Sequence, residues 1–488
     1  MRLSVRRTTA PGLLASLALA GFLAGIFAEG HAQVPNPSSA ANPFYGSVTA
    51  HPATDEVLRL SLDDAIASGL KNNLGLKEAE NGEKTLQGQK NEALQNFLPT
   101  VTLQGDLGVH QQNLAALGFG PDTIKMFSKL FPGGSMPAGF SEITRDDLTD
   151  GQIHYRQMIF SGPVIAAWRA AGAAERAAHF QKMSARGEVV QQVASAYLHA
   201  IAAASEVDNA KALEATGEKL VLDAHEAHLA GVAANLDELR ARVQLQAQQQ
   251  ARIAAQNAFE KDLILLKREI GIDPGQRIAL SDPAPYGDLA AQTVEELRAL
   301  AYRSRQDYQT LQNQAVEMKA IHAAYRSQRL PSLSFGGFYG VSQVGGAGSH
   351  GNFAAVGTLS LPLFREAKLR GDTDLAQAQL DAVRAQLDDL RAKIDFQVRS
   401  ALLDVAATAK LVEVARSNVE LATRNLSDET DRVGAGVDDN LPLVTAQATL
   451  ATAESNLVES RYQYNLAKLA LARAAGVIET QYRDYLGR

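Results

Sequence analysis

The sequence predicts a mainly α-helical fold with a β-barrel portion, built from a helix–β-hairpin–long-helix unit that occurs twice. Three observations support this prediction. Landmark residues recur about 205 positions apart, pairs of segments alternate in polarity, and two stretches of more than 60 residues have the composition of helices. The duplication accounts for most of the 488 residues.

The composition excludes several classes of protein. The formal net charge of −7 gives nucleic-acid binding no electrostatic support. The chain has no cysteine, and therefore no thiol nucleophile, disulfide framework or iron–sulfur ligands. It also has no nucleophile elbow and no Gly-rich phosphate loop after a strand. We therefore expect neither an enzyme nor a bound cofactor.

Residues 1–32 have the features of a secretory signal peptide. Three arginines come first, an apolar run from Leu13 to Phe27 follows, and the small residues Gly30 and Ala32 suit a signal peptidase. The alternative is a membrane anchor, but the run is shorter than the ~20 residues that span a bilayer. We expect an exported protein, with residues 33–60 as an extended N-terminal tail.

The two halves of the chain correspond through landmarks at a nearly constant distance. Gly231 and Gly271 in the first half match Gly436 and Gly476 in the second, and both pairs are 205 residues apart. A Leu-Pro pair ending at Pro99 recurs at Pro331, before each β segment. These landmarks predict a first repeat at 61–279, a linker at 280–292, a second repeat at 293–476 and a C-terminal tail at 477–488.

Alternating polarity predicts one β-hairpin in each half. Apolar and polar residues alternate from Thr100 to His110 and again from Ser332 to Ser342. The first hairpin holds 28 extra residues, around Gln112–Asp150, which we interpret as an enlarged loop. Four strands are too few for a membrane barrel, which needs about eight. Because open strand edges in lipid cost several kcal/mol per unsatisfied group, the barrel must be shared between chains.

Two long helices are expected at 166–230 and 366–433, and each would span ~100 Å. Apolar residues recur at every seventh position from Val398 to Val433, which predicts left-handed coiled packing. An ordinary soluble helical bundle would show the same heptads.

A shorter helix, at 232–270 or 438–475, is expected after each long one. The helical segments near 61–97 and 293–329 would supply the missing length by stacking end to end with the shorter helices. The expected result is a helical cylinder with the strands at one end and the Gly turns at the other.

These features together resemble the outer membrane efflux (TolC-like) family over roughly residues 60–476. A Leu-x-x-x-x-Ala frame after each Gly turn, from Leu236 and from Leu441, adds to the resemblance. The resemblance implies a homotrimer whose 12-stranded β-barrel lies in outer-membrane lipid, above a periplasmic helical tunnel. It also implies a passive conduit for tripartite efflux or type I secretion, with a periplasmic adaptor and an inner-membrane pump as partners. The sequence does not distinguish between drugs, metal ions, siderophores and polypeptides as the cargo.

The resemblance further implies that the adaptor contacts the tip turns. The matching residues are Ala230, Gly231, Val232, Ala435, Gly436 and Val437. Their residue types also suit a plain helix stop, since glycine tolerates a left-handed backbone.

Acidic residues just after these turns are candidates for the periplasmic entrance: Asp237, Asp438 and Asp439. Asp237 begins a family-like Asp-x-Leu frame, whereas the second half has Pro442 at that place. In three chains such carboxylates would surround a narrow mouth and favour cations. Alternatively, they are solvated acids that stabilise a helix N-terminus. His225, Glu226 and His228 are more consistent with a solvated helix face than with a metal site.

A protein of another class also fits part of this pattern. An exported periplasmic coiled-coil scaffold would have the same signal peptide and heptads, with its hairpins forming soluble sheet. Extraction from the outer membrane only by detergent would favour the channel.

Overall fold

The computed structural model describes residues 38–48, 52–118, 120–130, 133, 143–231, 234–283, 287–344, 348–435 and 440–487. The expected signal peptide lies outside the described residues, as do Val232, Gly436, Val437, Asp438 and Asp439. Residues from Ser38 onward form one compact unit.

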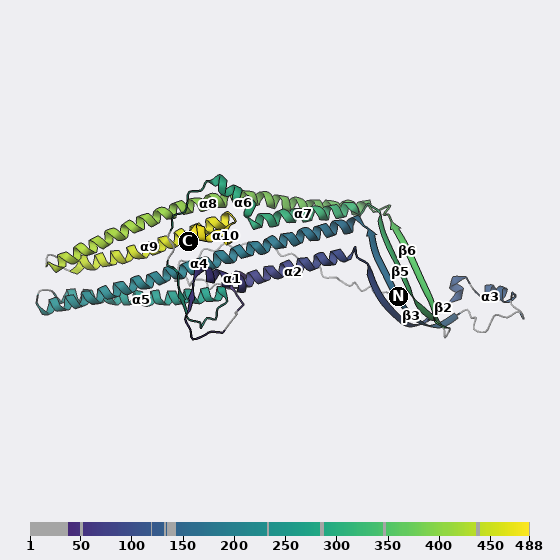
Figure 1. Ribbon diagram of the computed structural model, residues 1–488, viewed down its shortest axis with the longest axis horizontal. Helices are drawn as coiled ribbons and strands as arrows, with labels where there is room; N and C mark the ends of the chain where they lie inside the picture. The colour runs from purple at the N-terminus through teal and green to yellow at the C-terminus, as the bar shows by residue number, and fades with distance from the viewer. Residues whose placement is uncertain are drawn as a thin grey trace, which may run out of the picture. The chain divides into compact units, whose positions relative to one another are not determined.

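The duplicated unit predicted from the sequence is confirmed. The first repeat contains α1 (Leu62–Asn72), α2 (Leu74–Gln95), β2 (Thr100–Asn113), β3 (Ile143–Phe160), α4 (Gly162–Leu229) and α5 (Asn235–Ile270). The second contains α6 (Val294–Ser304), α7 (Gln306–Ser327), β5 (Ser332–Val344), β6 (His350–Ser360), α8 (Glu366–Gly434) and α9 (Asn440–Ala474). Figure 1 shows the strands at one end of α4 and α8, and the beginnings of α5 and α9 at the other.

The helical segment before each first strand is two helices, not the one that the sequence suggested. The first segment breaks at Asn73 and the second at Arg305, and both residues have extended backbone. The side chain of Asn73 accepts a hydrogen bond from the N–H of Leu76 and caps α2. Arg305 instead holds Asp307 through two hydrogen bonds of 3.0 and 2.6 Å.

The shorter helices end at these breaks. Gly271 ends α5 and has a φ of +78°, and a Cβ on it would lie 2.6 Å from the Cβ of Asn72. Gly476 follows α9, also has a φ of +78°, and would place a Cβ 2.7 Å from the backbone nitrogen of Arg305. This agrees with the end-to-end stacking expected from the helix lengths (Figure 1).

The four long strands form one antiparallel sheet in the order β2-β3-β5-β6. The β2–β3 ladder runs without a break from the Thr100–Arg156 pair to the Asn113–Ile143 pair. The two ends of the predicted enlarged loop, 112–113 and 143–150, are therefore strand, because the ladder continues past the alternating segment. What remains of it includes a 3-10 helix, η2 (Leu114–Leu117), and the short helix α3 (Pro121–Ser128).

The main hydrophobic core lies where the two repeats meet, around Val193 and Tyr197 of α4 and Leu469 of α9. Three elements there had no signal in the sequence. Strands β1 (Leu58–Leu60) and β4 (Ile278–Leu280) form a parallel pair, and Tyr197 donates a 2.8 Å hydrogen bond to the carbonyl of Leu60. Helix α10 (Ile478–Leu486), within the expected C-terminal tail, buries Ile478, Tyr482, Tyr485 and Leu486.

Candidate functional site

One face of the four-stranded sheet is apolar and exposed. The register aligns Leu103, Ile153, Tyr339 and Phe353 in one row across all four strands. Their exposed fractions are 81%, 50%, 69% and 76%, although apolar side chains of this size are usually buried. Strand alternation puts further exposed apolar residues on this face: Val101, Leu107, Val109, Phe335, Val341 and Leu359. A continuous apolar surface of this kind marks a site of contact with lipid or protein.

The opposite face of the sheet is mostly polar, although Phe338 and Val356 also lie on it. Asp106, Asp150, Ser342 and His350 lie in one row across the four strands. Ser342 donates a hydrogen bond of 2.5 Å to the Asp150 carboxylate, and Asn352 donates one of 2.6 Å to the Ser342 hydroxyl oxygen. The sheet therefore has one apolar face and one face on which polar side chains form hydrogen bonds.

The sheet has two open edges. In the described part of the chain, β2 and β6 each pair with a strand on one side only. Their outer backbone N–H and C=O groups are left for water or for another chain.

The turn at the far end of α4 has the geometry expected from its glycine. Gly231 has a φ of +74°, and its N–H donates to the carbonyl of His228 at 2.9 Å. Ala230 ends α4 and Ala435 ends α8. Among the described residues, a Cβ on Gly231 would meet no atom within 4 Å, and the left-handed backbone favours glycine there.

The acids that follow this turn are held by bases of the same chain. Glu238 lies 3.2 Å from Nδ1 of His225 on α4 and 2.5 Å from Nη2 of Arg242 one helical turn on. The hydrogen bond with His225, helped by the charge of Arg242 against the effect of burial, lowers the pKa of Glu238. The candidate entrance acid Asp237 pairs with Arg240 at 3.4 Å.

The sequence did not single out Glu238, because its contact with His225 depends on the register between α4 and α5. The Glu238–Arg242 spacing of four residues was its only sequence signal. Among the residues the structure describes, no group of three or more potential ligands could hold a metal ion. His225 contacts Glu238 instead.

A groove runs between α5 and α9 near the tip. Leu236, Leu239 and Val243 of α5 line it with Leu441 and Val444 of α9, and its volume is about 350 Å³. It shares Gln244 with a second groove of about 400 Å³, which α4, α5 and α9 line with alanines and polar side chains. Leu236 and Leu441 are equivalent residues of the two repeats, so both repeats contribute alike to this surface.

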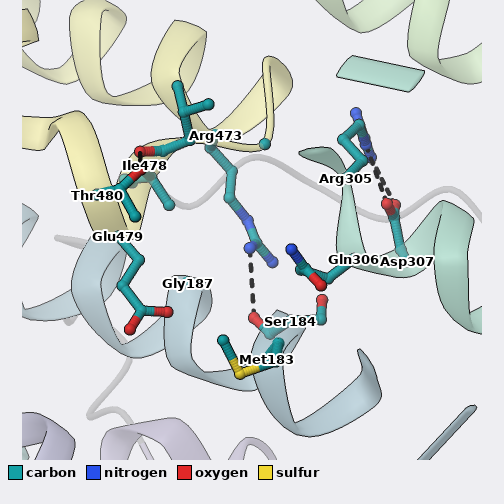
Figure 2. A pocket seen from close by; sticks show the side chains of 12 residues that line it. Met183, Ser184, Gly187, Arg305, Gln306, Asp307, Arg473, Ile478, Glu479 and Thr480 are labelled. Carbon is teal, nitrogen blue, oxygen red and sulfur yellow. Dashed lines mark hydrogen bonds and ion pairs between the residues drawn. The ribbon is translucent and has the colours of Figure 1, made fainter. Parts of the chain in front are cut away.

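A separate pocket of about 150 Å³ lies where α4, the α6–α7 break and α10 meet (Figure 2). Arg473 enters it and donates hydrogen bonds to the Ser184 carbonyl at 3.3 Å and to Glu188 at 2.8 Å. The Arg305 guanidinium binds Asp307 at its other wall. Both guanidinium groups are thus bound to other groups of the chain. The pocket lies between the two repeats.

No described helix combines the length and apolarity needed to cross a bilayer.

Comparison with known proteins adds a family and a fold. The model of a family described as outer membrane efflux protein matches residues 65–271 and 300–477. No curated protein sequence matches.

Several solved structures share the fold. A membrane protein from Pseudomonas aeruginosa has a TM-score of 0.71 at 19% identity, over 85% of this chain and 93% of that one. The CmeC outer membrane channel of Campylobacter jejuni has a TM-score of 0.69 at 16% identity, over 90% of this chain and 92% of that one. The outer membrane protein VceC of Vibrio cholerae has a TM-score of 0.69 at 19% identity, over 85% of this chain and 96% of that one.

Proposed function

The chain belongs to the outer membrane efflux protein family, and from that membership we propose that it forms the outer-membrane channel of a tripartite efflux or type I secretion system. In this role it is a passive conduit. An inner-membrane pump supplies the energy, and a periplasmic adaptor joins the pump to the channel.

The exposed apolar row across the sheet is the observation that carries this proposal. Strand β2 presents apolar side chains from Val101 to Val109, a length of roughly 27–30 Å before any tilt. The apolar band of an outer-membrane barrel is about 25 Å tall. With this face in lipid, the row of Asp106, Asp150 and Ser342 faces the aqueous bore.

The two open sheet edges support a homotrimer. Joining β2 of one copy to β6 of the next satisfies the edge groups, and three sheets of four strands make a 12-stranded barrel. The helices also expose apolar side chains outside the groove between α5 and α9. Ile253 is exposed on α5, and Phe396, Leu403 and Val414 are exposed on α8. A head-to-tail contact between these two surfaces closes into a ring when the rotation allows it.

The tip turns are the proposed adaptor contact, through Ala230, Gly231, Val232, Ala435, Gly436 and Val437. The described residues Ala230, Gly231 and Ala435 follow the ends of α4 and α8 that lie opposite the sheet, which supports this role (Figure 1). The exposed side chain of Leu229 beside the first turn adds apolar contact area. Asp237, Asp438 and Asp439 are the proposed acids of the periplasmic entrance.

Membrane extraction and mass measurement test the assembly. The mature protein should require detergent for extraction from the outer membrane and should have the mass of three chains in light scattering. A monomer in the aqueous periplasmic fraction would contradict the channel and favour a coiled-coil scaffold.

Bulky substitutions test the tip contact separately. Gly231→Trp and Gly436→Trp should abolish export by cells while the trimer mass stays unchanged. Gly88→Trp is the matched control, because Gly88 is an exposed helical glycine with open space around it. Unchanged export in both tip variants would show that the adaptor binds elsewhere.

A further inference from the structure

The connection between β2 and β3 is unusually apolar for a surface loop. Residues 114–140 contain ten large apolar side chains and only three charged ones, Asp122, Lys125 and Lys129. Loops at the end of a sheet normally face water and are polar. This stretch has a net charge of +1, in a chain whose net charge is −7.

Helix α3 and the residues directly after it expose apolar side chains. The exposed fractions of Met126, Phe127 and Leu130 are 62%, 39% and 75%. Lys125 and Lys129 are also exposed and lie one helical turn apart, beside the apolar stripe. Lysines that flank an apolar stripe are typical of helices that lie in a membrane–water interface.

The position of α3 relative to the apolar face of the sheet indicates what covers the apolar side chains of α3. The apolar side chains of β2 end at Leu107 and Val109, and the strand then continues to Asn113 before α3 begins. Figure 1 shows α3 beyond the ends of β2 and β3 that lie away from the long helices. In the proposed channel, this is the place where the sheet leaves the hydrocarbon layer.

We propose that α3 binds the surface of the membrane into which the sheet inserts. Met126 and Leu130 enter the boundary between headgroups and acyl chains, and Lys125 and Lys129 contact anionic headgroup phosphates. This inference rests on the proposed function, because it needs the sheet to span that membrane.

Lipid is a better occupant than a second copy of α3. If three copies met over the pore, two lysines from each would bring six ammonium groups together, against three carboxylates from Asp122. Phosphates at the membrane surface complement the lysines instead. The membrane interface also accommodates both the apolar stripe and its charged flank.

Spin labelling of the full chain tests this binding. The sequence has no cysteine, so each introduced cysteine carries the only label. The variants are Met126→Cys, Leu130→Cys and Lys125→Cys, with Leu103→Cys as the reference on the apolar sheet face. Each is reconstituted as the assembled protein in vesicles of phosphatidylcholine and phosphatidylglycerol. Collision of the nitroxide with oxygen reports lipid, and collision with a water-soluble nickel chelate reports water.

The inference expects labels at 126 and 130 to collide more with oxygen than with nickel, as at 103, and the reverse at 125. In vesicles of phosphatidylcholine alone, or in a Lys125→Gln/Lys129→Gln background, the labels at 126 and 130 should move toward water. Nickel-accessible labels at 126 and 130 beside an oxygen-accessible label at 103 would overturn the inference and leave the channel intact. Labels at 126 and 130 shielded from both agents would also overturn it, in favour of contact between copies. A nickel-accessible label at 103 would contradict the proposed function itself.

Discussion

Gly476 lies against the backbone of Arg305, so closely that a Cβ on the glycine would lie 2.7 Å from the backbone nitrogen of Arg305. The first repeat has the same arrangement between Gly271 and Asn72. Both glycines have a φ of +78°. In each repeat the end of the short helix therefore packs closely at the break between the two helices that precede the hairpin. We call this contact the joint.

Alanine at either joint should destabilise the chain. Gly476→Ala and Gly271→Ala each combine a left-handed backbone with a backbone or Cβ clash, and we expect a loss of about 1–3 kcal/mol per site. The midpoint of thermal unfolding of the mature protein, followed by circular dichroism, measures this. Gly371→Ala is the control in an open position of α8 and should gain up to about 1 kcal/mol. Equal midpoints for all three variants would show that the joints are not tight.

The Glu238–His225 contact should protect the tip from local opening. Glu238→Gln removes the charge that binds both His225 and Arg242, and amide hydrogen exchange from 225 to 242 should become faster. Glu226→Gln changes an exposed neighbour and should leave the exchange unchanged.

The same contact should depend on pH with a definite sign. Because the pKa of Glu238 is lowered in the folded chain, its stabilisation is complete above the ordinary glutamate pKa. This stabilisation is lost as the pH falls through the lowered pKa. The amide exchange rates of the parent and of Glu238→Gln should therefore become equal in acid. A difference that grows as the pH falls would refute this assignment.

The two faces of the sheet should respond differently to a charge. Leu103→Arg puts a guanidinium in the apolar row and should cost about 2–4 kcal/mol if it lies near the middle of the bilayer. Gln104→Arg, on the opposite face of the same strand, should be tolerated because that face is polar. The yield of assembled protein in the outer membrane, read by heat-modifiable gel mobility, compares the two. The reverse order of yields would mean that the faces have been assigned the wrong way round.

Glu269 should make the helical core less stable as the pH rises. Its side chain is fully buried, and burial raises its pKa to about 7, against the opposing effects of a 2.9 Å hydrogen bond from Gln192 and of the charge of Arg268. Between the ordinary glutamate pKa and about pH 7, the folded chain holds a proton that the unfolded chain has lost, so stability falls by up to about 3 kcal/mol over this range.

Thermal midpoints across this pH range measure the effect of Glu269. Glu269→Gln should flatten the dependence and raise the midpoint at pH 8, whereas the exposed Glu218→Gln should change neither. A parent protein with the same slope as Glu269→Gln would exclude a protonated Glu269.

Local patterns allowed much of this fold to be predicted. The strands appear as period-two alternation and the long helices as heptads, and both signals need only neighbouring residues. The left-handed turn at Gly231 was also expected from its residue type. The break at Arg305 was not, because neither proline nor glycine marks it in the sequence and Gly476, which lies against it, is far away along the chain.

Contacts between distant segments account for what the sequence did not reveal. The strand Leu58–Leu60 is too short for a period-two pattern and exists through its pairing with Ile278–Leu280. The burial of Glu238 likewise depends on how α5 packs on α4, and no property of the residue itself indicates it.

Conductance in a planar lipid bilayer tests the central claim most directly, that several copies of this sheet close one water-filled pore. The purified, detergent-extracted mature protein should give uniform conductance steps, and the same sample dissociated to monomers by heat should give none. Folded protein of trimer mass that inserts into the bilayer without conducting would contradict the account.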